Sequence, residues 1–340
     1  GVPRRSTHCI ASAASDVYKR QDMRRCVEVG ALGPRVLMGE SKKRPICSSH
    51  FMQESRPAAL LTLVRHAESM ANVDRVLQGV CDAPLSPRGS KQLQQLEDAW
   101  RPTSASLNLF DLPKPALIVT SPIGRAKRTS CAIARGCGIN TLPESDTTTF
   151  RSAHCEAPQH VAHDTVRADA GLSERHFGTA ECTRKMQPVQ GYERPPSKEL
   201  GRAESVTAFY KRAADVGVKW MDWLETYARH NLQDRGSPDS DHQNKAPDTI
   251  PHLVLVSHGQ WINAFLQQHL PDTWEKADLY YIQSANTSLF TIGLHVTPTS
   301  RRLELLRRND TRHLDETTRP SKRGRRAKPP QRTTLTALWS

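Results

Sequence analysis

Several features that would place a protein in a well-defined class are absent from this sequence of 340 residues. It contains no run of eighteen apolar residues, so no membrane-spanning helix is predicted. The N-terminus has no apolar stretch of the kind found in secretory signals. None of the eight cysteines belongs to a C-x-x-C pair, so we expect reduced thiols and a cytoplasmic location rather than a disulfide framework.

Excess positive charge is also missing where a nucleic-acid-binding surface would need it. The net charge is +13, but residues 58–306 contain 27 basic and 27 acidic side chains. The excess lies in residues 1–57, with 11 basic against 5 acidic, and in residues 307–340, with 10 against 3. Proteins that bind nucleic acids concentrate basic residues on a folded surface. We therefore expect no nucleic-acid partner.

The chain divides into three parts by composition. Residues 1–57 show no sustained hydrophobic period, and we expect a disordered or artefactual extension, in which residues 1–21 resemble a translated sequencing adapter. Residues 58–306 contain the periodic apolar segments of one domain. Residues 307–340 are basic and poor in apolar side chains, which predicts a disordered tail. The basic cluster at 322–328 could direct nuclear import, although a solvated tail is the simpler interpretation.

In the central part, short apolar runs alternate with amphipathic segments. Strands are predicted at 60–64, 115–120, 253–256, 288–292 and 303–306, helices at 87–100, 122–135, 203–230 and 260–269, and polar loops at 142–169 and 231–250. Ser86–Pro87 and Ser121–Pro122 have the pattern of a capping residue followed by a first helical proline. Alternating strands and helices predict a single-domain, three-layer α/β/α sandwich with a mostly parallel sheet.

Two apolar runs far apart in the sequence end in a histidine followed by a small residue. Residues 60–69 read LLTLVRHAES and place His66 after the first strand, and residues 252–259 read HLVLVSHG and place His258 after another. In open α/β sheets, ligands bind just outside the carboxyl ends of the strands. We therefore expect both imidazoles at one crevice, beside the guanidinium group of Arg65. Such an arrangement suits phosphate chemistry.

Further motifs occur between these two segments. In chain order they are RHAES at 65–69 with Asn72, QG at 78–79 with Asp82 and PLS at 84–86, SPIGRA at 121–126 with Thr129, LSERHFG at 172–178 and SHG at 257–259. Together they resemble the signature of the histidine phosphatase superfamily, which includes phosphoglycerate mutases. The resemblance implies a phosphatase that acts on a small phosphorylated metabolite.

The resemblance also implies a role for each matching residue. His66 would attack phosphorus and become phosphohistidine. Glu174 would protonate the leaving oxygen and later take a proton back from water, and His258 would be the third catalytic residue. The substrate-binding residues would be Arg65, Asn72, Arg125, Ser257 and Gly259.

Physical chemistry supports these roles independently. A transferring phosphoryl group spreads negative charge over its oxygens, and Arg65 and Arg125 can each offer it two donors. The adjacent Arg65 disfavours the charged form of His66, which must be neutral to attack. Glu174 needs a raised pKa to act as an acid, which a nearby phosphate dianion would provide. Because cationic side chains can do the work of Mg²⁺, we expect neither a metal nor a cofactor.

Structural interpretations of some residues remain open. Glu174 could be a solvated loop carboxylate, and Arg125 an ordinary surface residue at a helix start, where a cation opposes the helix dipole. The 142–169 loop also contains possible metal ligands whose spacing matches no standard site, namely His154, Cys155, His160, His163 and Asp164.

The chain departs from the family pattern in ways that bear on its substrate. Ala67 replaces the usual glycine, and residues 179–182 (TAEC) replace an aromatic–acidic–glycine step. No long basic insertion typical of the mutases is evident after Glu174, so we favour a phosphatase over a phosphoglycerate mutase. A degenerate relative that binds phosphorylated ligands without catalysis is the third alternative. The substrate and the oligomeric state stay open.

Overall fold

A computed structural model of the chain describes eight segments. They are residues 56–103, 107–139, 166–185, 187–192, 201–236, 250–274, 282–297 and 299–319, all within one compact unit, residues 53–340. The predicted extension up to residue 55, the candidate metal ligands of the 142–169 loop and the basic cluster at 322–328 lie outside the described residues.

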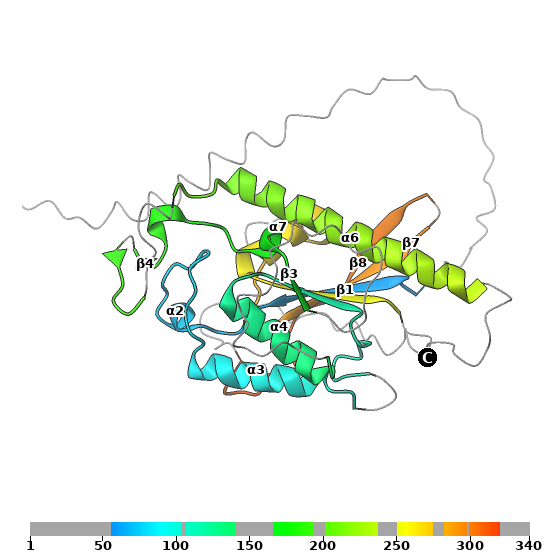
Figure 1. The fold of residues 1–340 in the computed structure, drawn as a ribbon, viewed down its shortest axis with the longest axis horizontal. Coiled ribbons are helices and arrows are strands. Elements are labelled where there is room, and N and C mark those ends of the chain that lie inside the picture. Colours follow the sequence, from blue (N-terminus) through cyan, green and yellow to red (C-terminus); the bar gives the residue numbers. More distant parts are fainter. Residues whose placement is uncertain are drawn as a thin grey trace, which may run out of the picture. The chain divides into compact units, whose positions relative to one another are not determined.

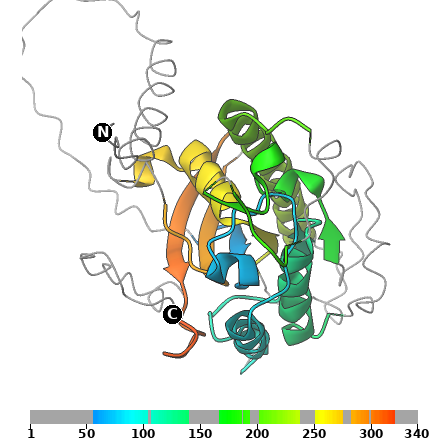
Figure 2. The same cartoon turned by 90° about the vertical axis from the view of Figure 1, so that its left-hand side faces the viewer.

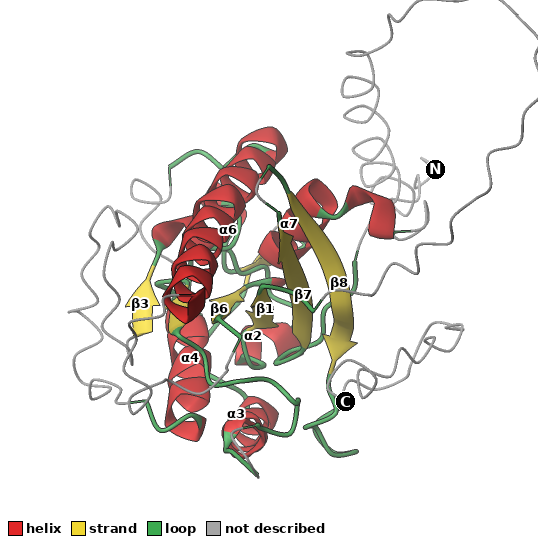
Figure 3. Cartoon of the chain, turned by 90° about the vertical axis from the view of Figure 1, so that its right-hand side faces the viewer, coloured by secondary structure: helices red, strands yellow, loops and turns green. Residues whose placement is uncertain are grey.

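A six-stranded, mostly parallel sheet forms the centre of the fold, in the order β3–β2–β6–β1–β7–β8 (Figure 3). The strands are β1 (Ala59–Arg65), β2 (Leu117–Thr120), β3 (Val166–Ala168), β6 (His252–Ser257), β7 (Leu289–Val296) and β8 (Arg301–Asp310). Strands β1, β2, β3 and β6 run parallel, whereas β7 pairs antiparallel with β1, and β8 antiparallel with β7. The predicted α/β class is thereby confirmed.

Helices cover both faces of this sheet, with α6 and α7 on one face and α3 and α4 on the other (Figure 1). The helices are α2 (Met70–Val73), α3 (Pro87–Trp100), α4 (Gly124–Gly136), α6 (Val206–Gly236) and α7 (Gly259–His269), with short turns η2 (Ala170–Leu172), η3 (Gly178–Ala180) and η4 (Pro271–Thr273) and a hairpin of β4 (Thr183–Arg184) and β5 (Gln187–Pro188).

Strand β1 shows how the sequence produces three layers. Its side chains alternate, so Leu61 and Leu63 enter the core beneath α6 and α7, while Leu60 and Val64 enter the core beneath α3 and α4. All four are at most 1% exposed, and each such burial contributes about 1.5–3 kcal/mol. A strand buried on both faces reads as a continuous apolar run, which is why the sequence alone revealed it.

The register of the sheet brings the two histidine segments together. Arg65 at the end of β1 lies opposite Ser257 at the end of β6, so His66 and His258 leave adjacent strand ends. Strand β2 borders β6 on its other side, and Ser121 follows it at the same edge. Helix α2 follows β1 at this edge (Figure 2). The predicted meeting of both imidazoles at one edge of the sheet is confirmed.

One of the two predicted helix starts is confirmed and the other is wrong. Ser86 caps α3, with its Oγ accepting from a backbone N–H of the first turn at 2.9 Å. Helix α4, however, begins at Gly124 rather than after Ser121. The first turn of α4 donates instead to a residue distant in sequence, since the backbone N–H of Arg125 lies 3.3 Å from Oδ1 of Asp82.

Two loop predictions need correction. The predicted 142–169 loop contains β3, which pairs with β2 but has only three residues and therefore shows no readable period. Residues 231–236, the first part of the predicted 231–250 loop, belong to α6, which continues to Gly236. Polar residues there do not stop a helix, because a helix extending beyond the sheet needs no apolar face.

The predicted boundary between domain and tail is also wrong. Strand β8 continues to Asp310, and residues 311–319 fold back onto the body. Leu314 is 1% exposed, and the Oγ1 of Thr318 donates to Oε1 of Gln95 in α3 at 2.6 Å. Residues 307–319 therefore belong to the folded domain, despite the charge that predicted a tail.

Candidate active site

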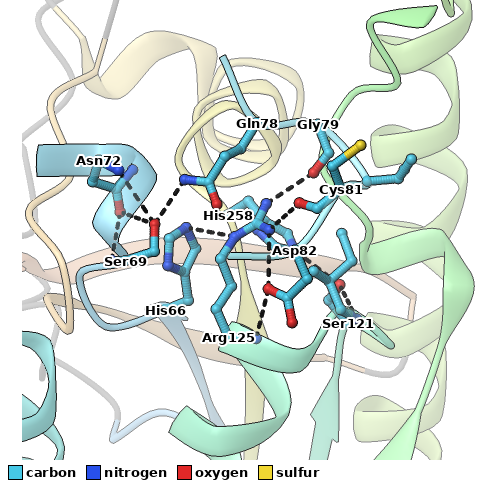
Figure 4. Close-up of polar contacts among 12 residues, drawn as sticks. His66, Ser69, Asn72, Gln78, Gly79, Cys81, Asp82, Ser121, Arg125 and His258 are labelled. Atoms are coloured by element: carbon cyan, nitrogen blue, oxygen red, sulfur yellow. Dashed lines mark hydrogen bonds and ion pairs between the residues drawn. The ribbon is translucent and has the colours of Figure 1, made fainter. Parts of the chain in front are cut away.

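His66 directly follows β1 and is almost completely buried. Its Nδ1 lies 2.7 Å from the carbonyl oxygen of Ala67, and its Nε2 lies 3.4 Å from Nε of Arg125 (Figure 4). A carbonyl only accepts and a guanidinium N–H only donates, so Nδ1 carries the hydrogen and Nε2 keeps its lone pair. Burial, with the charges of Arg125 and Arg65, holds the pKa of His66 well below its usual range. His66 is thus a neutral imidazole, as a nucleophile requires.

A loop after α2 orients the guanidinium group of Arg125 toward Nε2 of His66. Its Nη1 donates to the carbonyl oxygen of Cys81 and its Nη2 to that of Gly79, both at 2.8 Å, and Nη1 lies 3.5 Å from Oδ1 of Asp82. The side chain is 1% exposed, so the predicted alternative of an ordinary surface residue is wrong. To bind a phosphate through two donors, Arg125 would have to give up its hydrogen bonds to these carbonyl oxygens.

His258 follows β6 and lies beside His66, with 5.1 Å between the ring centroids. Its Nε2 lies 2.8 Å from Oγ of Ser121. Its Nδ1 is buried and has no hydrogen-bond partner in the described part of the chain. Burial, followed by the charge of Arg125, holds the pKa of His258 well below its usual range.

Glu174 is the acidic group of the same site and is 7% exposed, which excludes the alternative of a solvated loop carboxylate. Its Oε1 accepts from the backbone N–H of Arg175 at 2.9 Å and its Oε2 from that of Gln260, in the first turn of α7, at 3.2 Å. Burial raises the pKa of Glu174 despite these two hydrogen bonds and the opposing charges of Arg125 and Arg65. The raised pKa therefore does not require a phosphate, in contrast to the argument from sequence.

Arg65 and Gly259 fit together at the strand ends. The Nη1 of Arg65 donates to the carbonyl oxygen of Ser284 at 2.6 Å. A Cβ atom added at Gly259 would lie 3.3 Å from Nε of Arg65, which is a tight contact. Gly259 thus leaves room for the guanidinium group, and this spacing is a structural reason for glycine at the start of α7.

Ser257 is engaged away from the substrate space. Its Oγ donates to the carbonyl oxygen of Leu172 at 2.6 Å. From α6, the Nη1 of Arg212 donates to the carbonyl oxygen of Ser173 at 2.9 Å. Both bonds anchor the turn that presents Glu174. Substrate binding by Ser257 remains a prediction, while the observed contact makes it a positioning residue.

Asn72 belongs to a polar chain at the edge of the site. Its Oδ1 accepts from both the backbone N–H and the Oγ of Ser69 at 3.1 Å. Gln78 donates to the same Oγ at 2.7 Å (Figure 4). The Nδ2 of Asn286 donates to the carbonyl oxygen of His66 at 3.0 Å. Contact of Asn72 with substrate remains a prediction. The QG motif signalled Gln78, whereas nothing in the sequence singled out Asn286.

Glu181 holds the loop that orients Arg125, and the sequence argument missed it. Its fully buried carboxylate accepts from the backbone N–H groups of Val80 at 3.1 Å, Cys81 at 2.8 Å and Phe177 at 3.0 Å. The acidic residue of the TAEC segment, Glu181, therefore has a structural role. Among the described residues, no group of three or more His, Cys, Asp or Glu side chains is placed to hold a metal, and none of the described helices could cross a bilayer.

A comparison with protein families matches the first part of the domain, which contains His66 and Arg125. Residues 61–148 match the family model of the histidine phosphatase superfamily (branch 1). The resemblance predicted from the motifs is confirmed over these residues, which are about a quarter of the chain.

Curated relatives match a similar stretch. The "Probable phosphoglycerate mutase GpmB" of Cronobacter sakazakii is 36% identical over 80 residues, which are 24% of this chain and 33% of that protein. The protein of the same name from Salmonella arizonae is 38% identical over 83 residues, or 24% and 34% of the two chains. The matched stretch thus spans about a third of the length of these relatives.

Solved structures resemble more of the chain. A structure named mycobacterial hydrolase 1 covers 76% of this chain and 100% of its own, with a TM-score of 0.46 and 20% identity. A mycobacterial glucosyl-3-phosphoglycerate phosphatase covers 76% and 100%, with a TM-score of 0.45 and 21% identity. A phosphoserine phosphatase from Entamoeba histolytica covers 75% and 99%, with a TM-score of 0.44 and 21% identity. At these scores the fold class rests on the strand order and register described above.

Proposed function

We propose that the protein hydrolyses monoesters of small phosphorylated metabolites through a phosphohistidine at Nε2 of His66. The observation that carries the proposal is the neutral imidazole of His66, whose Nε2 lone pair faces the guanidinium group of Arg125 at 3.4 Å. Cations around a nucleophile attract the negative oxygens of a phosphate and bring its phosphorus within reach.

The first step forms a bond between Nε2 of His66 and phosphorus while the ester P–O bond breaks. Charge that develops on the phosphoryl oxygens is stabilised by Arg65 and Arg125, which supply in this reaction the charge that Mg²⁺ supplies in others. Glu174, whose pKa is raised by burial, acts as the acid and gives its proton to the leaving oxygen.

The second step returns the enzyme to its starting state. The carboxylate of Glu174 takes a proton from water as the water oxygen attacks phosphorus. The P–N bond breaks, its electron pair returns to Nε2 of His66, and inorganic phosphate leaves. The hydrogen on Nδ1 stays donated to the carbonyl oxygen of Ala67 throughout, so the same ring nitrogen, Nε2, is used in every cycle.

Transfer to a second hydroxyl group instead of water is the competing outcome, because the curated relatives are named as phosphoglycerate mutases. A mutase must retain its product until the phosphoryl group is returned. Supplying 3-phosphoglycerate to the full chain and assaying both the isomer and free phosphate separates the two. We expect free phosphate without isomer.

The central test compares the full chain with its His66→Ala variant on p-nitrophenyl phosphate and a sugar-phosphate panel. We expect turnover and an acid-labile phosphoenzyme in the parent and neither in the variant. Turnover retained by His66→Ala would refute the proposal. Ligand binding by calorimetry with no phosphoenzyme in the parent chain would identify a degenerate binding protein instead.

A further inference from the structure

A pocket of about 230 Å³ lies between the first turns of α6 and α7, two helices that pack on the same face of the sheet (Figure 3). The residues that line it are Arg175, Val206, Phe209, Tyr210, Gln260 and Asn263. Two of these, Arg175 and Gln260, are the residues whose backbone N–H groups hold the carboxylate of Glu174. The pocket therefore adjoins the proposed acid.

This position has a consequence for the substrate, provided that the proposed function holds. Glu174 protonates the oxygen that departs, so the organic group attached to that oxygen must extend past Glu174. We propose that the pocket receives the leaving group of the ester, and that it selects a flat, apolar alcohol moiety such as an aromatic ring on a short arm.

The apolar side chains of the pocket support this choice. Phe209 is 1% exposed, and its ring meets that of Tyr210 edge-on, with 6.1 Å between centroids. The hydroxyl of Tyr210 donates to Oε1 of Gln267 at 3.0 Å, which fixes the ring beside the pocket. A pocket of this volume has room for one ring system. A rigid aromatic wall favours a flat partner over a hydrated sugar.

Two polar side chains at the pocket have partners within the protein. The Oδ1 of Asn263 accepts from the backbone N–H of Ile282 at 2.7 Å. The Nε of Arg175 donates to the carbonyl oxygen of Glu204 at 3.0 Å. The carboxylate of Glu204 forms its ion pair with Arg212 at 2.8 Å, so Arg175 is the pocket residue that would attract an anionic leaving group, and 3-phosphoglycerate tests that alternative below.

The test compares three substrates on the full chain: benzyl phosphate, glycerol 3-phosphate and 3-phosphoglycerate. Benzyl and glycerol phosphates both release a primary alcohol, so their intrinsic reactivity is similar and their ratio of kcat/KM reports binding of the leaving group. We expect benzyl phosphate to be favoured at least about tenfold over both others, as filling an apolar pocket with a matching group allows.

Substitutions locate the preference. Tyr210→Ala should lower the benzyl-to-glycerol ratio about tenfold, whereas Tyr210→Phe should keep it, because the ring provides the contact. Tyr227→Ala is the matched control, since Tyr227 lies on the same helix, stacked on Trp223, and does not line the pocket. It should leave the ratio unchanged.

Three results would each overturn the assignment of the pocket. They are a benzyl-to-glycerol ratio near one in the parent chain, a ratio in Tyr210→Ala equal to that of the parent, and a preference for 3-phosphoglycerate. Any of them, with turnover still abolished by His66→Ala, leaves the proposed function intact. If no ester is hydrolysed, or if His66→Ala hydrolyses all three, the proposed function itself fails.

Discussion

His66 and His258 occupy equivalent places in the sheet and yet are held differently. Each follows the last residue of one of two adjacent parallel strands. His66 has its Nδ1 on the carbonyl oxygen of Ala67, which keeps Nε2 for chemistry, whereas His258 has its Nε2 on the hydroxyl of Ser121. The position at a strand end brings each imidazole to the site. The hydrogen-bond partner of one ring nitrogen then determines whether the other nitrogen is available as a nucleophile.

The most direct way to break this comparison is to remove each ring in turn. In His66→Ala we expect turnover to fall at least about 10³-fold with no phosphoenzyme, because the nucleophile is gone. In His258→Ala we expect a fall of about 10²-fold, the cost of one stabilising donor, with the phosphoenzyme still formed. Labelling of both variants, quenched in base so that the acid-labile P–N bond survives, checks this, and label on His66→Ala would reverse the assignment.

Arg125→Lys tests what distinguishes His66 from its neighbour, the guanidinium directed at Nε2. A lysine ammonium group is a point charge that cannot donate to the carbonyls of Gly79 and Cys81 and also face His66. We expect kcat/KM to fall about 10²-fold. Arg128→Lys, at an exposed residue of the same helix, is the control. An equal loss of kcat/KM in Arg128→Lys would show that the orientation of the Arg125 guanidinium group toward His66 is not what matters.

Ser121→Ala sharpens the comparison from the other side, since it removes the partner of Nε2 in His258. A buried polar atom left without a partner costs about 1–3 kcal/mol, and we expect stability and turnover both to fall, turnover about tenfold. Ser130→Ala removes another buried hydroxyl bond, to the carbonyl oxygen of Lys127 within α4. It should affect stability alone, as measured by urea unfolding beside the rate assay.

A histidine outside the site gives the smallest effect and a baseline. His252 begins β6, and its ring nitrogens lie 2.9 Å from Oγ1 of Thr62 and 2.8 Å from the carbonyl oxygen of Pro113. Burial lowers the pKa of His252 to about 4. The unfolded chain therefore binds this proton first, so its contribution to stability is complete above pH 6.5 and is lost as the pH falls toward 4.

We expect His252→Gln to reduce the pH dependence of the unfolding free energy in that window by about 1.4 kcal/mol per pH unit. Urea unfolding at pH 7 and pH 5 measures this difference, with the exposed His230→Gln as the control. An unchanged slope would show that His252 is not the group that titrates.

Much of the fold could be predicted because it depends on local patterns. The apolar runs of β1 and β6 are buried on both faces, and Ser86–Pro87 caps its helix from adjacent residues. The start of α4 was missed because its backbone partner is Asp82, more than forty residues away. The C-terminal segment was missed because its charge hides the buried Leu314.

The candidate site divides in the same way. His66, His258, Arg125 and Glu174 were found from motifs, and the structure brings them to one edge of the sheet. The contacts of Ser257 with Leu172 and of Glu181 with three backbone N–H groups could not be found from spacing. They join segments that only folding brings together.

The sequence alone determined the order of strands and helices, the residue types at the strand ends and the kind of chemistry they suit, because these follow from local periodicity and from side-chain chemistry. The tertiary structure alone decided which ring nitrogen of each histidine is available, why Glu174 can hold a proton and what borders it. Those properties depend on burial and on hydrogen-bond partners far away in the chain.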